Sequence, residues 1–290
     1  MKKITITDNI IQKHYIGLKD KLNELQNDFD KLNSPYTVKD ILISKPERLY
    51  EIGEWSKKQS INFNYMINKY ENFTTKKKRD YDAYDLAKSL NVNTCPYCNI
   101  NSIYTVVEDE KEEKIVRPEF DHFFDKDTYP ILSLSIYNLI PSCHQCNSNL
   151  KHTKSFNLDE YIHPYIDDLD KEIKFNLKII DSKFYYSIDG FETEIKNINN
   201  SIKVKNHLRV FKIEERYKYL KDIILELIQK KYMYNDSYLD ELLKKYEGTL
   251  FKNKEDLLRL ISGRYISEDE INKRPLSKLI KDISEYINFI

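Results

Sequence analysis

Two short cysteine motifs constrain this chain of 290 residues more than any other feature of its sequence. Cys95 and Cys98 form the string CPYC, Cys143 and Cys146 form CHQC, and these are all four cysteines of the chain. Two Cys-x-x-Cys pairs have the spacing of two zinc knuckles that close on one tetrahedral ion. Two disulfides or four separate buried thiols are the alternatives, which a reducing compartment disfavours. Because four cysteine ligands leave no open coordination position, the predicted zinc is structural.

The composition fits a globular, mainly helical protein. Hydrophobic residues make up 40% and charged residues 32%, the mean hydropathy is −0.66, and five glycines leave few breaks in helical patterns. No apolar stretch approaches the ~20 residues of a membrane span. The first residues, MKKITITDNI, lack the apolar core of a secretory signal, so a cytoplasmic location is expected.

Charge divides the chain into three parts. Residues 91–165 carry 11 acidic and 6 basic residues, whereas the flanks are balanced or slightly basic and the whole chain has zero formal net charge. We therefore expect an N-terminal helical region at 1–90, a cysteine-bearing module at 91–165 and a C-terminal region at 166–290. A β-hairpin is predicted at the start of the last region, with strands at 174–180 and 183–188 and a turn at Asp181 and Ser182.

Apolar periodicity predicts the helices of both flanks. One amphipathic helix is expected over residues 9–32, with Asp8 as its cap, and shorter ones over 39–44, 46–55 and 81–90. Three apolar stripes predict helices near residues 220–228, 239–243 and 257–261. The basic run at 76–79 is read as a solvated face, with a phosphate contact as the alternative.

The segment between the cysteine pairs predicts two strands and a helix. An apolar run reaches Asp121 and His122, where the first strand should end, and alternation over residues 132–137 predicts the second strand. Ser142 is the expected N-cap of a helix that carries the second cysteine pair. A further hairpin with an acidic turn is expected upstream, from strand 102–107.

The predicted helix places polar side chains opposite the end of the first strand. Asn147 and Lys151 are one turn apart and share a face, which would face Asp121 and His122. A carboxylate and an amide oxygen bind a hard cation, an imidazole deprotonates water, and a lysine neutralises phosphate. This cluster has the components for phosphodiester hydrolysis.

The pattern resembles the ββα-metal motif of the HNH endonuclease family. The likeness rests on Asp121-His122, Asn138 and the string CHQCN, and it covers residues 93–155. It implies an α+β, mainly helical protein with a central HNH module. His122 would be the general base, Asp121 and Asn147 would bind the catalytic metal, and Asn138 would brace the loop that carries His122.

The resemblance also implies cofactors, a substrate and a partner. Lys151 is the candidate phosphate contact, and Asn147 in place of the family's frequent histidine favours Mg²⁺ or Mn²⁺. The extended match at 120–147 is similar to the HNH nuclease subunits of bacterial anti-phage systems such as Septu and retron-associated nucleases. These commonly partner an ATPase, and since no GxxxxGK loop is present, that ATPase would be a separate chain.

DNA is the preferred substrate, and its cleavage would leave 5′-phosphate ends as in the family. An RNA nuclease acting on tRNA is one alternative, because both polymers present the same phosphodiester. A zinc-dependent module that binds nucleic acid or a partner without cutting is the other.

Overall fold

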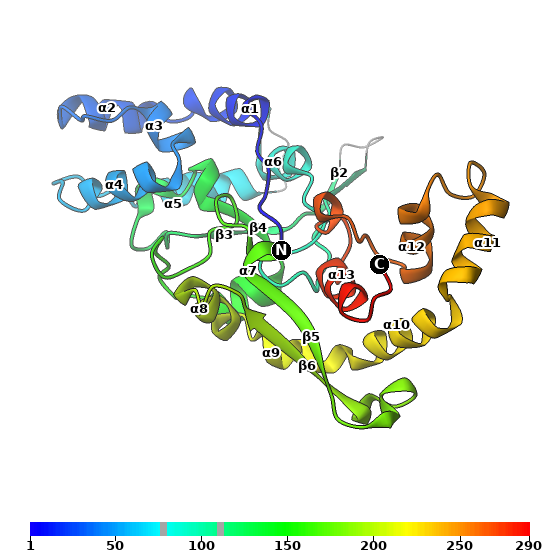
Figure 1. Ribbon diagram of the computed structural model, residues 1–290. Helices are drawn as coiled ribbons and strands as arrows, with labels where there is room; N and C mark the ends of the chain where they lie inside the picture. The colour runs from blue at the N-terminus through cyan, green and yellow to red at the C-terminus, as the bar shows by residue number, and fades with distance from the viewer. Residues whose placement is uncertain (76–79, 109–112) are drawn as a thin grey trace. The chain divides into compact units, whose positions relative to one another are not determined.

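The computed structural model describes residues 1–75, 80–108 and 113–290 (Figure 1). In these ranges the protein is α+β and mostly helical, as predicted, with three small antiparallel sheets of two strands each. No helix in them is long and apolar enough to cross a bilayer. The chain forms two compact units: one contains 4–93 and 103–167, and the other contains 1–3, 94–102 and 168–290. The division expected near residues 90 and 165 stays a prediction.

The unit of residues 4–93 and 103–167 begins with helices. They are α1 (Asp8–Lys19), α2 (Asn23–Lys31), α3 (Val38–Ile43), α4 (Pro46–Ser56), α5 (Tyr65–Thr74) and α6 (Ala83–Leu90). The single helix expected over 9–32 is therefore two, because the bend between them buries both Leu18 and Leu22. The predicted N-cap, Asp8, is also wrong. Thr7 caps α1, its hydroxyl accepts the N–H of Ile10, and Asp8 is the first helical residue.

Four short strands follow α6 in the chain. They are β1 (Val106–Glu108), β2 (Glu113–Val116), β3 (Glu119–His122) and β4 (Leu139–Ser142). The expected upstream hairpin is β1–β2, and its acidic turn, 109–112, lies outside the described residues, as does the basic run at 76–79. The predicted end of the first strand at His122 is confirmed, and β3 pairs with β4 so that Asp121 lies opposite Ile140.

The second strand lies further along the chain than the sequence predicted. Residues 132–137 form turns of 3₁₀-helix, η1 (Pro130–Leu132) and η2 (Ile136–Asn138), and β4 starts only at Leu139. Alternation predicts a strand when its polar face meets water, but Ser133 and Ser135 are fully buried. The Ser133 hydroxyl donates to the carbonyl of Pro130 within its own turn, and the Ser135 hydroxyl donates to the carbonyl of Ile41 in α3.

The helix with the second cysteine pair also starts later than expected. It is η3 (Gln145–Lys151), a helix with wide π-type turns that follows His144. Ser142 is the last residue of β4, and its buried hydroxyl has no hydrogen-bond partner among the described residues. Ser142 as the N-cap is therefore wrong.

The second unit contains one hairpin and most of the C-terminal helices. Its elements are α7 (Leu169–Glu172), β5 (Ile173–Ile179), η4 (Ser182–Tyr185), η5 (Ile188–Gly190), β6 (Phe191–Asn197), α8 (Ile202–Val210), α9 (Ile213–Tyr217), η6 (Lys218–Leu220), α10 (Lys221–Met233), α11 (Asp236–Tyr246), α12 (Lys254–Ser262), η7 (Glu268–Glu270) and α13 (Ser277–Tyr286). The three apolar stripes are confirmed as α10, α11 and α12.

The expected hairpin is present, but its second strand was placed wrongly. β5 pairs with β6, and residues 182–190 form the two short 3₁₀ turns between them. The carboxylate of Asp181 accepts the N–H of Lys183 and so starts a turn instead of a tight two-residue loop. Gly190 completes the connection, because a Cβ there would lie 2.1 Å from the backbone nitrogen of Phe184.

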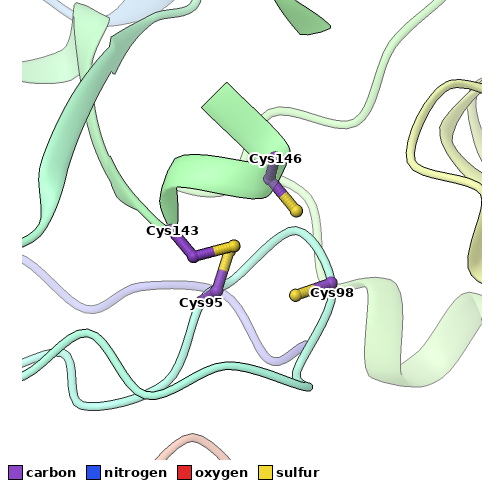
Figure 2. Close-up of side chains that lie close together, drawn as sticks. All are labelled: Cys95, Cys98, Cys143 and Cys146. Carbon is purple, nitrogen blue, oxygen red and sulfur yellow. The ribbon is translucent and has the colours of Figure 1, made fainter. Parts of the chain in front are cut away.

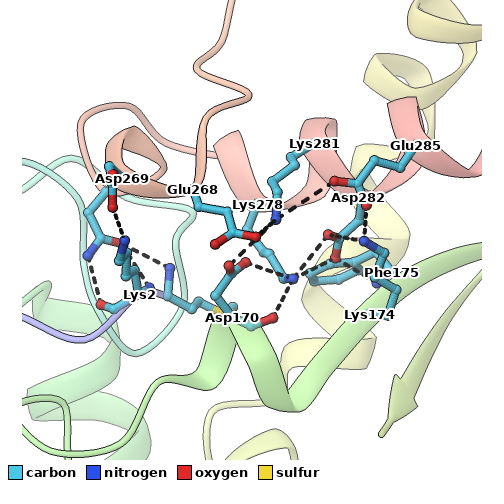
Figure 3. Close-up of polar contacts among 12 residues, drawn as sticks. Lys2, Asp170, Lys174, Phe175, Glu268, Asp269, Lys278, Lys281, Asp282 and Glu285 are labelled. Atoms are coloured by element: carbon cyan, nitrogen blue, oxygen red, sulfur yellow. Dashed lines mark hydrogen bonds and ion pairs between the residues drawn. The ribbon is translucent and has the colours of Figure 1, made fainter. Parts of the chain in front are cut away.

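A buried group of charged side chains holds α13 in this unit (Figure 3). The ammonium of Lys278 lies 2.8 Å from Asp170 and 3.0 Å from Asp282, and all three side chains are almost fully buried. Asp282 also accepts the N–H of Phe175 in β5 at 2.9 Å. Lys174 pairs with Asp282 and Glu285, which ties β5 to the same helix.

Candidate functional site

The two cysteine pairs form one cluster, as Figure 2 shows. The sulfur atoms of Cys95, Cys98, Cys143 and Cys146 all lie within 4.8 Å of one another, and all four residues are buried. Zn–S bonds of about 2.3 Å place the sulfurs of a tetrahedral site about 3.8 Å apart. The cluster is consistent with the structural zinc that the sequence predicted.

The loop of the first pair has the backbone of a metal knuckle. The N–H of Asn99 donates to the carbonyl of Cys95 at 2.8 Å, and the left-handed conformation of Asn99, with φ of 54°, reverses the chain. The N–H of Ile100 then points at the sulfur of Cys98, 3.4 Å away. A backbone donor directed at this sulfur stabilises its thiolate form, which is the form that binds zinc.

Side chains of the C-terminal helices hold this loop from within their unit. The hydroxyl of Tyr217 donates to the carbonyl of Cys98, and Nε2 of His207 bonds the carbonyl of Tyr97, both at 2.7 Å. The Tyr97 ring stacks on Phe211 with 4.4 Å between ring centres. Loop and helices therefore form one packed structure.

His122 lies at the end of β3 with one ring nitrogen fixed. Its Nε2 is 3.0 Å from the carbonyl of Ser133, and because a carbonyl only accepts, Nε2 carries the proton. Nδ1 then has the lone pair, with no hydrogen-bond partner among the described residues. The Tyr70 ring packs edge-on against the imidazole at 4.4 Å. Burial lowers the pKa of His122 to about 4, which keeps the imidazole neutral at pH 7.

Asn138 fixes the loop that follows His122. Its Oδ1 accepts the N–H of Phe124 at 2.7 Å, while its Nδ2 donates to the carbonyls of Phe124 and Leu132, both at 3.1 Å. The side chain is fully buried. The bracing role that the resemblance implied for Asn138 stays a prediction.

Asp121 and Lys151 form a buried ion pair. The ammonium of Lys151 lies 2.9 Å from Oδ1 of Asp121 and donates to the carbonyl of His122 at 2.6 Å. Lys151 is 2% exposed, and its ammonium also lies over the Phe156 ring. The lysine that was expected at a substrate phosphate thus contacts the Asp-His pair itself.

Glu119 is a site residue that the sequence did not single out. Its carboxylate contacts Nδ1 of His144 at 2.6 Å and accepts from Nδ2 of Asn147 and the hydroxyl of Ser148, both at 2.9 Å. Partial burial raises the pKa of Glu119, but these hydrogen bonds outweigh it and leave the pKa below its usual value. The sequence could have pointed to Glu119. Residues two positions apart in a strand share a face, and Glu119 lies two residues before Asp121 in the predicted strand.

The two acidic residues therefore connect one face of β3 with η3. Asp121 contacts Lys151 at the end of this helix, and Glu119 contacts Asn147 near its middle. The structure brings together Asp121, Lys151 and the backbone of His122. It adds Glu119 as the partner of Asn147.

Comparison with known proteins gives one partial similarity. Septu protein PtuB of Bacillus thuringiensis is 36% identical over 82 residues, which is 28% of this chain and 28% of the relative. The match thus spans little more than a quarter of either protein. No protein-family model matches the chain, and no solved structure matches it.

Proposed function

We propose that this protein is a metal-dependent endonuclease of the HNH type that hydrolyses DNA phosphodiester bonds. The arrangement of His122 carries the proposal: its Nε2–H is held by Ser133, its Nδ1 has a lone pair, and it follows Asp121 at a strand end. A histidine so oriented accepts a proton from water in one defined direction.

The residues around Asp121 and Asn147 fit a hard divalent cation. Both side chains offer oxygen, the donor that Mg²⁺ and Mn²⁺ prefer. Glu119 accepts from the amide nitrogen of Asn147, so Oδ1 is the end available to a cation. When bound, Mg²⁺ or Mn²⁺ neutralises charge on the phosphate and on the departing oxygen.

The chain's own residues orient and deprotonate the attacking water. Nδ1 of His122 takes the proton as the water oxygen bonds to phosphorus, and the bond from phosphorus to the 3′ oxygen breaks, leaving a 5′-phosphate. Asn138 holds the loop beside the base. For Lys151 we propose a role that differs from the phosphate contact expected from the sequence: buried against Asp121, it fixes that carboxylate.

The similarity to a Septu protein supports a role in anti-phage defence. We propose that the nuclease acts there with an ATPase supplied by another chain. The N-terminal region 1–90, which is slightly basic, is the candidate to bind the DNA backbone, since phosphate neutralisation dominates DNA affinity.

Cleavage of plasmid DNA tests the proposal. Purified zinc-loaded protein is incubated with supercoiled plasmid or total RNA in Mg²⁺ or Mn²⁺, beside a chelator control. We expect metal-dependent cutting of DNA, reduced at least ~100-fold in His122→Ala because general-base catalysis is lost. Asn149→Ala is the control, because Asn149 is exposed.

The alternatives make different predictions in the same experiment. Cutting of RNA but not DNA would identify the RNA nuclease. If wild-type protein with full zinc content cuts neither polymer, it is no autonomous nuclease. Retained cutting in His122→Ala would remove His122 as the base.

A further inference from the structure

We propose that Glu119 is a positioning residue that sets the orientation of the Asn147 amide. This inference rests on the proposed function, in which Asn147 is a metal ligand. The carboxylate of Glu119 is 2.9 Å from Nδ2 of Asn147. An ionised carboxylate only accepts hydrogen bonds, so it selects the NH₂ end of the amide and turns Oδ1 the other way.

The surroundings of Glu119 keep its carboxylate in place. The hydroxyl of Ser148 donates to Oε2, the oxygen that also accepts from Asn147, while His144 contacts Oε1. Both oxygens are therefore engaged, and rotation of the carboxylate would break at least one contact. A ligand whose second end is fixed in this way binds metal with less loss of freedom.

Asp121 and Glu119 have different tasks although they share a face of β3. The carboxylate of Asp121 is 3% exposed and lies against the ammonium of Lys151, whereas the Glu119 side chain is 37% exposed and contacts three donors on or beside η3. Because the side chain is partly exposed, its removal leaves little buried cavity, and a loss of function will not arise from unfolding.

Mn²⁺ binding to the zinc-loaded full chain tests this role without relying on catalysis. Calorimetric titration with Mn²⁺ compares wild type, Glu119→Ala, Asn147→Ala and the double variant. We expect Glu119→Ala to weaken Mn²⁺ binding about 10- to 100-fold, as is typical of residues that orient metal ligands. In the Asn147→Ala background Glu119→Ala should add nothing, because Glu119 acts through that amide.

Two further variants separate orientation from other effects. Glu119→Gln retains an acceptor oxygen and should recover part of the Mn²⁺ affinity. Asn149→Ala, at an exposed residue of the same helix η3, is the control, and its Mn²⁺ affinity should match that of wild type. Zinc content and thermal unfolding should be unchanged in every variant.

Each other outcome rejects part of the proposal. Wild-type Mn²⁺ affinity in Glu119→Ala overturns the role of Glu119 and leaves the nuclease proposal standing. An equal loss in the presence and absence of Asn147 shows that Glu119 acts independently of that amide, which also overturns it. If wild type neither binds Mn²⁺ nor cuts DNA, the nuclease proposal and this inference both fail.

Discussion

Three buried histidines of this protein each use Nε2 to bond a backbone carbonyl. His14 bonds Leu134, His122 bonds Ser133 and His207 bonds Tyr97. Burial lowers the pKa of all three to about 4. Burial alone therefore does not identify a base. The second nitrogen is more informative, because Nδ1 of His14 contacts the Tyr81 hydroxyl, whereas that of His122 has no partner among the described residues.

The stability of the protein should fall as the pH drops from about 6.5 towards 4. An unfolded histidine binds a proton near pH 6.5, whereas folded His14 does so only near pH 4, so acid favours unfolding over this interval. At pH values above about 6.5, neutral His14 contributes on the order of 3 kcal/mol to the free energy of unfolding. Urea unfolding at pH 7 and pH 4.5 measures how steeply the free energy of unfolding depends on pH. His14→Gln should reduce the difference in the free energy of unfolding between the two pH values. An unchanged difference would contradict the lowered pKa of His14.

Asn138→Ala should destabilise the loop after His122. The change leaves the N–H of Phe124 and the carbonyls of Phe124 and Leu132 without their partner inside the protein. The expected loss is about 3 kcal/mol, measured from the urea midpoint. Asn149→Ala is the control, because Asn149 is exposed, and should change stability by less than about 0.5 kcal/mol. Equal effects of the two variants would argue against the bracing role.

At the scale of elements, sequence periodicity located most helices but misplaced strands. The stripes that became α10, α11 and α12 have apolar residues one turn apart, a pattern that local sequence determines. The alternation over 132–137 failed because both serines are buried, and Ser135 bonds to the carbonyl of Ile41, which lies near it only in the fold. α5, which buries Met66 and Phe73, has too weak a pattern to be predicted.

The candidate site was predictable where local sequence decides the placement of a residue. The end of the first strand at His122 followed from the apolar run before it. The burial of Lys151 against Asp121 depends on how η3 lies along β3, which spacing along the chain does not define. The contact between Glu119 and Asn147 joins residues 28 positions apart. It too depends on how η3 lies along β3.

Lys278→Met should detach α13 from its packing partners. The variant removes the cation between Asp170 and Asp282 and leaves two buried carboxylates. Breaking a buried ion pair on one side costs about 3–5 kcal/mol. Amide hydrogen exchange should show faster exchange in α13 and β5, while Lys273→Met, at an exposed pair with Glu270, should leave both unchanged. Protection equal to wild type would show that α13 is held by its apolar contacts alone.

For the whole molecule, zinc should be a condition of stability. Metal analysis of purified protein should give one zinc per chain, held by the four cysteines. Cys98→Ser should lower the zinc content and the thermal midpoint, because zinc binding contributes directly to folding free energy. A strong chelator should lower the wild-type midpoint in the same way. A full wild-type midpoint in zinc-free protein would contradict a structural metal.

The supports of the first cysteine loop come late in the chain. Residues 94–102 pack in the unit of 168–290, where Tyr217 holds the carbonyl of Cys98 and Lys278 donates its N–H to the Asn99 side chain. A ribosome synthesises about 120 further residues after Cys98 before Tyr217 exists, and about 60 more before Lys278, at about 5–20 residues per second. The nascent chain therefore passes many seconds without these two bonds to the loop, and a chain truncated before Tyr217 never forms them.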